Sequence, residues 1–550
     1  MDGKIIERGS KTQAKIIEGV KKASEAIATT LGPSGKAVAI DDGFGAPPTI
    51  TRDGAQVAKS IVFSDKLENM GAQLVKKAAT LTESVVGDGT STTSILIKEL
   101  SMKGQKALET GGNVNEIKSG MLKAGKWMED YIKKNAIKID GDKEKIRKVA
   151  TISANNDPEV GDLVVQAMEK VTENGLITAD LASGLDTVID ITTGMKLDRG
   201  WSSPQYITNQ ENGTCTMENP YILVVGEKIS SVNQMINIFQ AVIQNGGGRP
   251  LLIVCDDIDD TVNTTIIINV LRGALSCCVV KGIDFGDARK NAMNDIAVAT
   301  GATYICPENG IALVDATLES MGTAKKVVVS KDSTIIYQGG GDPDEIKNLS
   351  EVLSKRLQDP GISDYDKSKF SKRLANLTGG IAIIKAGGAS EAEKLNRKAT
   401  IEDSILASKS AIEEGCCPGG GYIFFKGSYE INKDHSFWKS LTGDEIEGAK
   451  IVVSSLPVIL KTVVTNAGES FDVISEHLRS KFKKGVIYDA KAKKYETPEE
   501  CNVYDSAKAL RVSLENSIST ASMILIIDCT IIEEPVESDE EMKKKLGPLA

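Results

Sequence analysis

The fold is decided by the apolar run Tyr221-Ile222-Leu223-Val224-Val225 and by the run Leu251-Leu252-Ile253-Val254 that follows it. Two more short apolar runs lie at residues 277–281 and 303–306. Segments with helical periodicity separate these runs, at about 231–244, 261–275 and 287–299. Strands that alternate with helices are typical of an α/β domain with parallel strand pairing. The middle of the chain is therefore predicted to form an α/β domain.

Helical patterns flank this middle segment on both sides. Apolar residues recur at helical spacing over 12–31, 70–84 and about 90–135, and again over 404–414 and 444–480. Short strands are expected at 37–40 and beside the turn at 49–54, and a solvated helix pair over 343–376. Helical material at both ends therefore brackets an α/β insertion.

Length and composition limit the class of protein. The chain has 550 residues, of which 41% are hydrophobic and 26% charged, so it is expected to fold into about three or four units. Its formal charge of −10 argues against nucleic acid as the main partner. We find no secretory signal pattern and no run of 18 apolar residues, so we expect no membrane partner and a cytoplasmic location.

Histidine and cysteine usage limits the chemistry. The chain has only 2 histidines, and its 9 cysteines show no C-x-x-C spacing. Zinc sites and histidine-dependent triads are therefore disfavoured, and most of the thiols are expected to be buried and inert. Any catalysis must depend on carboxylates, hydroxyls, backbone amides and a metal ion held by oxygen ligands.

The run Gly87-Asp88-Gly89-Thr90-Ser91-Thr92-Thr93 is the most specific candidate site. Glycines between two helices let the backbone approach an anion, and the second helix begins inside the run with free N–H groups. The hydroxyls can donate to phosphate oxygens, and Asp88 offers an oxygen ligand suited to Mg²⁺. An ordinary helix N-cap is the alternative interpretation.

Three further segments add weaker indications. The loop Thr30-Leu31-Gly32-Pro33 ends a helix, Arg52-Asp53-Gly54 forms a turn, and Gly419-Gly420-Gly421 is expected to follow a helix as its stop. Asp403 is expected at a helix start, either as a first-turn acid or as a carboxylate that activates water beside a phosphate. Neither a P-loop nor a kinase signature set is present.

Short motifs also follow one another along nearly the whole chain. They are Leu31-Gly32-Pro33, Phe44-Gly45-Ala46-Pro47, Thr49-Ile50-Thr51-Arg52-Asp53-Gly54, Glu68-Asn69-Met70-Gly71-Ala72-Gln73, Gly87-Asp88-Gly89-Thr90, Thr151-Ile152-Ser153-Ala154-Asn155, Asp198-Arg199-Gly200, Phe285-Gly286-Asp287, Ser363-Asp364-Tyr365-Asp366, Glu413-Glu414-Gly415 and Gly419-Gly420-Gly421. In this order they resemble the group I chaperonin family, the bacterial and organellar Hsp60 proteins.

The resemblance implies a multidomain α+β chaperonin fold. A mainly α-helical equatorial ATPase domain would comprise residues 1–135 and 414–550. A small α/β intermediate hinge domain would comprise 136–192 and 382–413, and an α/β apical domain would comprise 193–381. It also implies a homo-oligomeric ring, typically of seven subunits, with a co-chaperonin as a further partner.

The same resemblance implies an ATP site with Mg²⁺, and K⁺ as a further candidate ion. Asp88 would bind the metal, while Asp53 and Asp403 would position the hydrolytic water. The other residues expected around the nucleotide are Thr30, Leu31, Gly32, Pro33, Arg52, Gly87, Gly89, Thr90, Ser91, Thr92, Gly420 and Asp505. The residues expected to bind non-native polypeptides are Trp201, Tyr206, Ile236, Phe239, Ile267 and Ile268.

Several residues depart from the family pattern. Arg52 stands where Lys is usual, Ser91 replaces Thr, and Asp489-Ala490-Lys491 replaces Asn-Ala-Ala beside the adenine. Asn263 replaces an expected Leu and Gln205 an expected aromatic residue. The charged run from Glu533, expected to be disordered, stands where the family has a Gly-Met-rich tail. We predict an ATP-dependent protein-folding chaperonin. A ring-forming holdase with weak ATP use is the main alternative, and a small-molecule kinase or phosphatase is a weaker one.

Overall fold

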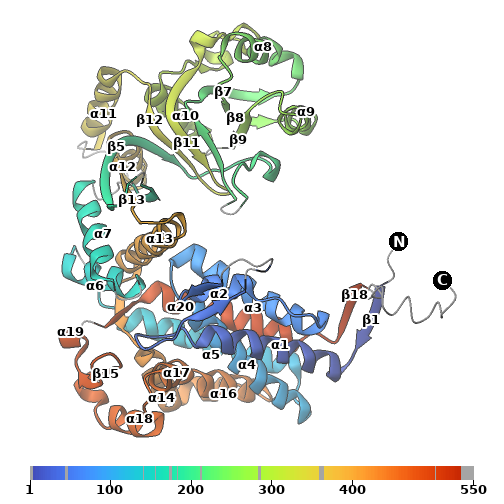
Figure 1. The fold of residues 1–550 in the computed structure, drawn as a ribbon, viewed down its shortest axis with the longest axis vertical. Coiled ribbons are helices and arrows are strands. Elements are labelled where there is room, and N and C mark those ends of the chain that lie inside the picture. Colours follow the sequence, from blue (N-terminus) through green and yellow to red (C-terminus); the bar gives the residue numbers. More distant parts are fainter. Residues whose placement is uncertain are drawn as a thin grey trace, which may run out of the picture. The chain divides into compact units, whose positions relative to one another are not determined.

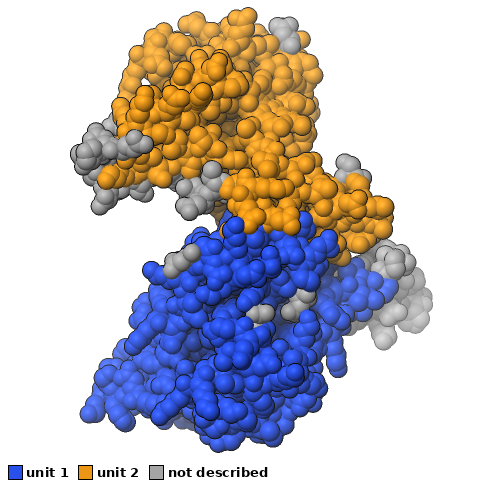
Figure 2. All heavy atoms as spheres, turned by 90° about the vertical axis from the view of Figure 1, so that its left-hand side faces the viewer, with its two compact units in different colours: residues 1–165, 399–550 blue, residues 166–398 orange. Residues whose placement is uncertain are grey.

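The computed structural model describes residues 4–41, 43, 48–139, 141–154, 157–171, 176–182, 184–210, 213–282, 286–357, 364–501 and 503–533. The chain forms two compact units, shown in Figure 2: unit 1 comprises Met1–Val165 and Ala399–Ala550, and unit 2 comprises Gln166–Lys398. The segment 44–47 and the charged tail 534–550 lie outside the described residues. The predicted intermediate segments are divided between the two units, and the three-domain division stays a prediction.

Unit 1 is mainly helical (Figure 1). Its helices are α1 Ser10–Ala28, α2 Gly54–Ser60, α3 Lys66–Val86, α4 Thr90–Glu109, α5 Val114–Asn135, α6 Lys143–Ser153, α14 Tyr422–Lys433, α15 His435–Lys439, α16 Glu445–Ser455, α17 Val458–Asn466, α18 Phe471–Ser480, α19 Pro498–Cys501 and α20 Ala507–Leu525. Two more helices, α7 Pro158–Lys170 and α13 Glu391–Glu414, have residues in both units. The predicted long helices of the first 135 residues are confirmed.

Close helix packing organises the core of unit 1. Helix α1 packs on α3 and α4, and α20 packs on α4 and α5. Gly19 and Gly71 let α1 and α3 approach, since a Cβ at these positions would lie 1.9 Å from the Glu68 carbonyl oxygen and 2.0 Å from that of Ile16. Aliphatic side chains such as Ile16 and Val75 fill the interface and are fully buried. Close helix contacts between aliphatic side chains thus fill the core of unit 1, although the chain has few aromatic residues.

Four two-stranded antiparallel sheets complete unit 1. They are β1 Lys4–Arg8 with β18 Cys529–Glu533, β2 Val38–Ile40 with β3 Thr49–Thr51, β14 Cys416–Pro418 with β17 Tyr504–Ser506, and β15 Ile487–Asp489 with β16 Lys494–Glu496. The sequence predicted the strands β2 and β3 but not that they pair with each other. The other strands are three to five residues long, too short for a clear alternating pattern.

One segment of unit 1 is long and apolar enough to cross a membrane, judged by length and composition alone. It is Glu445–Asn466, with 61% of its most apolar window buried inside the protein. The segment is broken at Leu456-Pro457 into α16 and α17, and α16 packs along α5. Buried core helices of this kind meet the same criterion, so the segment is weak evidence for a membrane span.

Unit 2 contains a ten-stranded mixed sheet with the order β4-β13-β5-β12-β11-β7-β8-β9, in which β10 also pairs with β7 and β6 with β11. Its strands are β4 Leu176–Leu181, β5 Val188–Leu197, β6 Cys215–Glu218, β7 Tyr221–Ile229, β8 Leu251–Ile258, β9 Cys277–Lys281, β10 Tyr304–Ile305, β11 Gly322–Val329, β12 Thr334–Gly339 and β13 Gly380–Ala386. Its helices are α8 Ile236–Asn245, α9 Asp260–Leu271, α10 Gly286–Thr300, α11 Pro343–Leu357 and α12 Asp364–Thr378.

The four predicted apolar runs are confirmed as parallel strands of this sheet, because β7 pairs in parallel with β8 and β10, and β8 with β9. Since β7, β8 and β9 are neighbours in chain order, right-handed crossovers place α8 and α9 on one face of the sheet. The antiparallel strands β5, β11 and β12 were not predicted. Strands β5 and β11 are only half buried, and their sequences mix charged and apolar residues.

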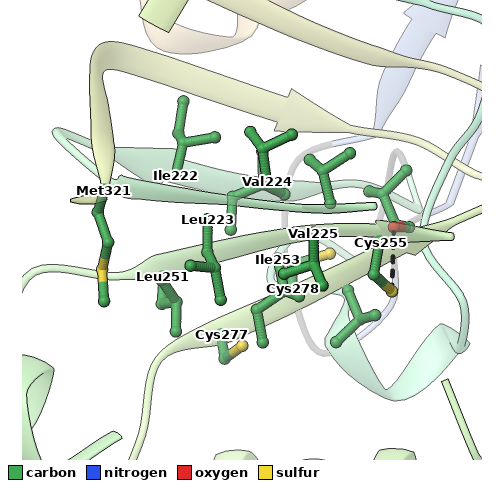
Figure 3. Packing of buried hydrophobic residues seen from close by; sticks show 14 of the residues in the cluster. Ile222, Leu223, Val224, Val225, Leu251, Ile253, Cys255, Cys277, Cys278 and Met321 are labelled. Carbon is green, nitrogen blue, oxygen red and sulfur yellow. Dashed lines mark hydrogen bonds between the residues drawn. The ribbon is translucent and has the colours of Figure 1, made fainter. Parts of the chain in front are cut away.

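The parallel strands form the core of unit 2 (Figure 3). Val224, Leu252 and Val279 are fully buried, as expected for strands that are covered on both faces. The thiols of Cys255, Cys277 and Cys278 lie in the same cluster. Burial raises the pKa of Cys255 to about 12. These thiols therefore stay protonated at neutral pH, in agreement with the prediction of inert cysteines.

Candidate functional site: a nucleotide pocket and an apolar surface

The loop between α3 and α4 is built from glycines that no other residue replaces easily. Gly87 closes α3 with φ 68° and Gly89 precedes α4 with φ 86°, both in the left-handed region. A Cβ at Gly87 would lie 2.5 Å from the Asp403 carbonyl oxygen, and a Cβ at Gly89 would lie 2.3 Å from Ser513 Oγ. The backbone of this loop therefore lies in close contact with α13 and α20.

The N-terminus of α4 is open to an anion. Gly89 is its N-cap, and no described side chain caps the helix. The first helical hydrogen bond is donated by Thr93 N–H to the Gly89 carbonyl oxygen at 2.8 Å. The N–H groups of Thr90, Ser91 and Thr92 thus lie free at the positive end of a 20-residue helix. This is the arrangement that binds phosphate in many proteins.

Two further loops lie against this helix end. Thr30 Oγ1 is 3.3 Å from Ser91 Oγ, and a Cβ on Gly54 would lie 2.5 Å from the same Ser91 oxygen. The side chain of Asn466 holds the first loop by donating to the carbonyl oxygens of Ala28 at 3.0 Å and Leu31 at 2.9 Å. The predicted segments 30–33, 52–54 and 87–92 therefore meet at one place.

Asp53 and Arg52 precede α2 at this place. Asp53 caps the helix, because its carboxylate accepts from Ala55 N–H at 2.8 Å and from Gln56 N–H at 3.3 Å. These bonds fix the orientation of the carboxylate beside Gly54. Arg52 is exposed and forms no ion pair with a described residue. Asp53 is therefore held in one orientation by backbone donors, whereas the exposed Arg52 is not held by an ion pair with a described residue.

Asp403 lies in the middle of α13, so the expectation of a residue at a helix start was wrong. Burial and the negative charges of Glu83, Asp53 and Asp88 raise its pKa to about 9. Burial also raises the pKa of Asp88, although the hydrogen bond from Gly89 N–H, at 2.6 Å, opposes that rise. Several carboxylates therefore act on one another in a partly buried space, where Lys59, 3.4 Å from Glu83, offsets part of their charge.

This carboxylate group fits a site that is completed by a divalent cation with its phosphates. Among the described residues, no three His, Cys, Asp or Glu side chains lie close enough to hold a metal ion by themselves. Mg²⁺ is commonly bound through one or two carboxylates together with substrate phosphates and water. Asp88, beside the open end of α4, is the carboxylate placed to share such an ion. Its charge would also favour the ionised forms of the surrounding acids.

The triple glycine borders the other side of the pocket. It follows strand β14 and leads into α14, so the expectation that it follows a helix as its stop was wrong. Gly420 and Gly421 have φ values of 66° and 78°. A Cβ at Gly419 would lie 2.9 Å from Asp505 Oδ1, which places Asp505 beside this loop. Burial and the charge of Asp88 raise the pKa of Asp505 to about 7.

The segment Asp489-Ala490-Lys491 forms the turn between β15 and β16. The Asp489 carboxylate accepts from Lys491 N–H at 2.7 Å and from Ala492 N–H at 3.1 Å. Ala490 is 5% exposed and packs in the apolar cluster that includes Val463 and Tyr488. Asp489 therefore stabilises the turn that contains it, and the buried Ala490 is part of the apolar cluster beside the turn.

Unit 2 carries the second candidate site, on α8 and α9. Exposed apolar side chains on α8 are Ile236 at 39% and Ile243 at 55% exposure, and those on α9 are Ile268 at 43% and Leu271 at 68%. The predicted residues Phe239 and Ile267 are partly buried against the core. Sequence reasoning missed Ile243 and Leu271, because periodicity alone does not tell which side of a helix between two strands faces solvent.

The predicted aromatic residues lie beneath these helices. Tyr206 is only 1% exposed, and its hydroxyl donates to Asn263 Oδ1 at 2.8 Å. Ser202 Oγ also donates to Asn263, at 3.2 Å. Trp201 is partly buried and donates its Nε1–H to the Gly213 carbonyl oxygen. The presence of Asn263 in place of an apolar residue is thus explained, because Asn263 accepts the hydrogen bond of the buried Tyr206 hydroxyl. Tyr206 supports α9 from beneath and does not line the surface.

Replacement of Asn263 tests this support. We expect Asn263→Ala to lower the local opening free energy of α9 by about 1–3 kcal/mol, because the buried Tyr206 hydroxyl loses its acceptor. Hydrogen exchange of residues 260–271 measures this change. In a Tyr206→Phe background the same substitution should cost clearly less. Equal costs in both backgrounds would contradict the role of the hydrogen bond.

The residues that the sequence predicted around a nucleotide lie near one another in unit 1, and their role in binding stays a prediction. Unit 1 brings together the predicted segments 30–33, 52–53, 87–92, Asp403, Gly420 and Asp505. Two residues were missed, Glu83 and Asn466. Glu83 lies one helical turn before Gly87, a spacing that could have indicated it, whereas the contact of Asn466 with the loop 28–31 spans more than 430 residues and carries no local signal.

Comparison with known proteins agrees with this architecture. The chain resembles the chaperonin gp146 from the bacteriophage EL 2 (Pseudomonas aeruginosa), crystallised in the presence of ATP-BeFx. One crystal form has 20% sequence identity and a TM-score of 0.71, over 96% of this chain and 99% of that chain. The other has 19% identity and a TM-score of 0.64 over the same shares. A model of the TCP-1/cpn60 chaperonin family matches residues 23–535. The multidomain α+β chaperonin fold is thereby confirmed, and the chain belongs to the TCP-1/cpn60 chaperonin family.

Proposed function

We propose that this chaperonin binds and hydrolyses ATP in unit 1 and uses the cycle to capture and release non-native polypeptides. The observation that carries the proposal is the open N-terminus of α4 beside Asp53, Asp88 and Asp403. Free N–H groups offer binding to phosphate, and the carboxylates offer a metal ligand and bases. Mg²⁺ bound there would supply charge neutralisation for the phosphates.

The proposed chemistry needs orientation and charge and involves no covalent step on the protein. Asp53, fixed by its two backbone donors, would accept a hydrogen bond from the attacking water. Asp403 would accept a proton from the same water, a role that requires its carboxyl group, with a pKa of about 9, to be ionised by the charge of a cation bound nearby. Thr30 and Ser91, held 3.3 Å apart, would bind phosphate oxygens. We expect hydrolysis to be slow and to set the timing of the conformational cycle.

Client binding is proposed for the apolar surface of α8 and α9, defined by Ile236, Ile243, Ile268 and Leu271. Exposed aliphatic side chains on adjacent helices are what a non-native chain with exposed apolar segments would contact. Non-native polypeptides are thus the expected partners, and movement of unit 2 during the ATP cycle would hide or expose the surface.

Assembly into a homo-oligomeric ring is supported by exposed apolar residues on two small sheets of unit 1. The β1–β18 and β2–β3 pairs are each two-stranded, and such pairs are marginally stable alone. Ile6, Ile50 and Ile531 on these strands are 56%, 70% and 62% exposed. Strand pairing between neighbouring subunits would cover them. The following points remain predictions: a ring of seven subunits, a co-chaperonin partner, K⁺ as a further ion, a cytoplasmic location and the three-domain boundaries.

Client capture tests the apolar surface. We expect Ile243→Ser with Leu271→Ser to weaken capture of a chemically denatured client about tenfold, since each exposed aliphatic residue loses part of the roughly 1.5–3 kcal/mol that its burial provides. Suppression of client aggregation without nucleotide measures capture. The matched control is Leu122→Ser with Val473→Ser, at exposed apolar positions of unit 1. Equal losses in both variants would contradict the assignment.

The holdase alternative rests on Asp489-Ala490-Lys491. Lys491 introduces a cation beside the predicted base position, so nucleotide affinity could differ from that of the family. A holdase would capture clients through the same α8 and α9 surface but release them without regard to ATP. The ATP dependence of release therefore separates the two functions.

A further inference from the structure

A strongly basic segment lies in the otherwise acidic chain, over residues 479–494 of α18, β15 and β16. This segment contains seven Lys or Arg residues and a single acid, Asp489, whereas the whole chain has a formal charge of −10. Such a local reversal of charge is an electrostatic feature that the fold itself does not require. It therefore indicates an anionic ligand or partner.

Four of these seven cations are not used inside the protein. Arg479 pairs with Glu476, Lys493 pairs with Glu469 at 2.9 Å, and Lys481 lies over the ring of Tyr495. The other four are exposed and form no ion pair with a described residue. They are Lys483, Lys484, Lys491 and Lys494. The group of four, called here the basic rim, is free to act on molecules in solution.

The basic rim lies next to the nucleotide pocket of the same unit. A Cβ at Gly420 would lie 4.0 Å from the Tyr488 carbonyl oxygen, which places the triple glycine against β15. Lys494 is paired in register with Asp489, and Lys491 follows directly in the turn. A Cβ at Gly32 would contact Val463 at 3.4 Å, and Val463 belongs to the same apolar cluster as Tyr488. The triple-glycine loop thus borders the hairpin that carries Lys491 and Lys494, while the loop at Gly32 packs on Val463 of the same apolar cluster.

The interior of the pocket has the opposite charge. Burial, together with the charges of Glu83, Asp53 and Asp88, raises the pKa of Asp403, so these acids lie close enough to act on one another. An approaching nucleotide triphosphate is itself highly negative, so these acids would repel it until it reaches the N-terminus of α4. Cations outside the pocket can offset this repulsion during approach, because charge interactions extend about 10 Å at 0.1 M salt.

We propose that the basic rim attracts nucleotide triphosphates and raises their rate of association with the pocket in unit 1. This inference rests on the proposed ATP function and deepens it by assigning residues that control nucleotide entry. Because the rim acts during approach and not in the bound state, its effect should fall on the association rate, should decrease with salt, and should be larger for ATP than for the less charged ADP.

Stopped-flow mixing with fluorescent N-methylanthraniloyl-ATP tests the proposal on the full chain. We expect Lys491→Glu with Lys494→Glu to lower the association rate about tenfold at low salt and less than about twofold in 0.5 M salt. The matched control is Lys11→Glu with Lys106→Glu, which has the same change in charge. Both control lysines are exposed, and each lies about 24–26 Å along α1 or α4 from the end of that helix at the pocket.

The outcomes separate this inference from the proposed function. An absence of saturable nucleotide binding in the wild type would overturn the proposed function itself. Normal wild-type binding with equal association rates in the two variants would overturn only the role of the rim. Equal slowing in both variants would assign the effect to total charge, and a change confined to the dissociation rate would make the lysines contacts of the bound nucleotide. Either of these last two results would also contradict the proposal that the rim attracts the nucleotide during its approach.

Discussion

Asp403→Asn should lower the rate of ATP hydrolysis by about 10²–10³-fold while nucleotide affinity changes less than about threefold. Asn keeps the size of the side chain but cannot accept the proton of the attacking water. Because burial and the charges of Glu83, Asp53 and Asp88 raise the pKa of Asp403 to about 9, its side chain is already neutral at pH 7 without a bound cation, and Asn should leave the pocket intact. Steady-state ATPase measurements with a separate nucleotide-binding titration check both parts.

Glu402→Gln is the matched control, since Glu402 is the exposed acid next to Asp403 on α13. Its hydrolysis rate should stay within about threefold of the wild type. An unchanged rate in Asp403→Asn would remove this residue from the proposed chemistry. A loss of nucleotide binding that parallels the loss of rate would instead assign Asp403 to binding.

Asp88→Asn should weaken Mg²⁺-dependent nucleotide binding by about 100-fold, the upper part of the range for disrupted metal sites. The hydrogen bond from Gly89 N–H at 2.6 Å can be retained by the Asn oxygen, so the loop between α3 and α4 should keep its conformation. Nucleotide titrations with Mg²⁺ and with a chelator check the result. The wild type should lose affinity in the chelator, whereas Asp88→Asn should be nearly insensitive to it.

A variant that binds nucleotide normally and still responds to Mg²⁺ would contradict the assignment of Asp88. Asp505→Asn serves as the comparison, since Asp505 lies at the other side of the pocket beside Gly419. It should alter affinity in Mg²⁺ and in the chelator to the same extent, because Asp505 is not proposed as a ligand of the metal.

The sequence predicted those parts of the fold that have a strong local pattern. The fully buried run Ile222–Val225 contains only apolar residues and indicated its strand directly. Strands such as β11, with half-buried alternation and two lysines, were missed because charged side chains on the solvent face hide the pattern. The β1–β18 pair joins the two ends of the chain, so no local signal could reveal it.

The candidate site was predictable where glycines and hydroxyl residues indicate an anion-binding loop, as in the run 87–93. The electrostatics of the site was not predictable, because the high pKa of Asp403 arises from its burial and from Glu83, Asp53 and Asp88, which are distant in sequence. Asn263 appeared as a loss of apolar character at the client surface. The structure explains it through the buried hydroxyl of Tyr206, a contact that only the folded unit creates.

The most direct test of the central claim is the ATP dependence of client refolding. A chemically denatured enzyme is captured by the chaperonin, and recovery of its activity is followed after addition of Mg²⁺-ATP, Mg²⁺-ADP or no nucleotide. The proposed function predicts recovery with ATP in clear excess over the other two conditions, and loss of repeated turnover in Asp403→Asn. Equal recovery in all three conditions would contradict an ATP-driven cycle and favour the holdase.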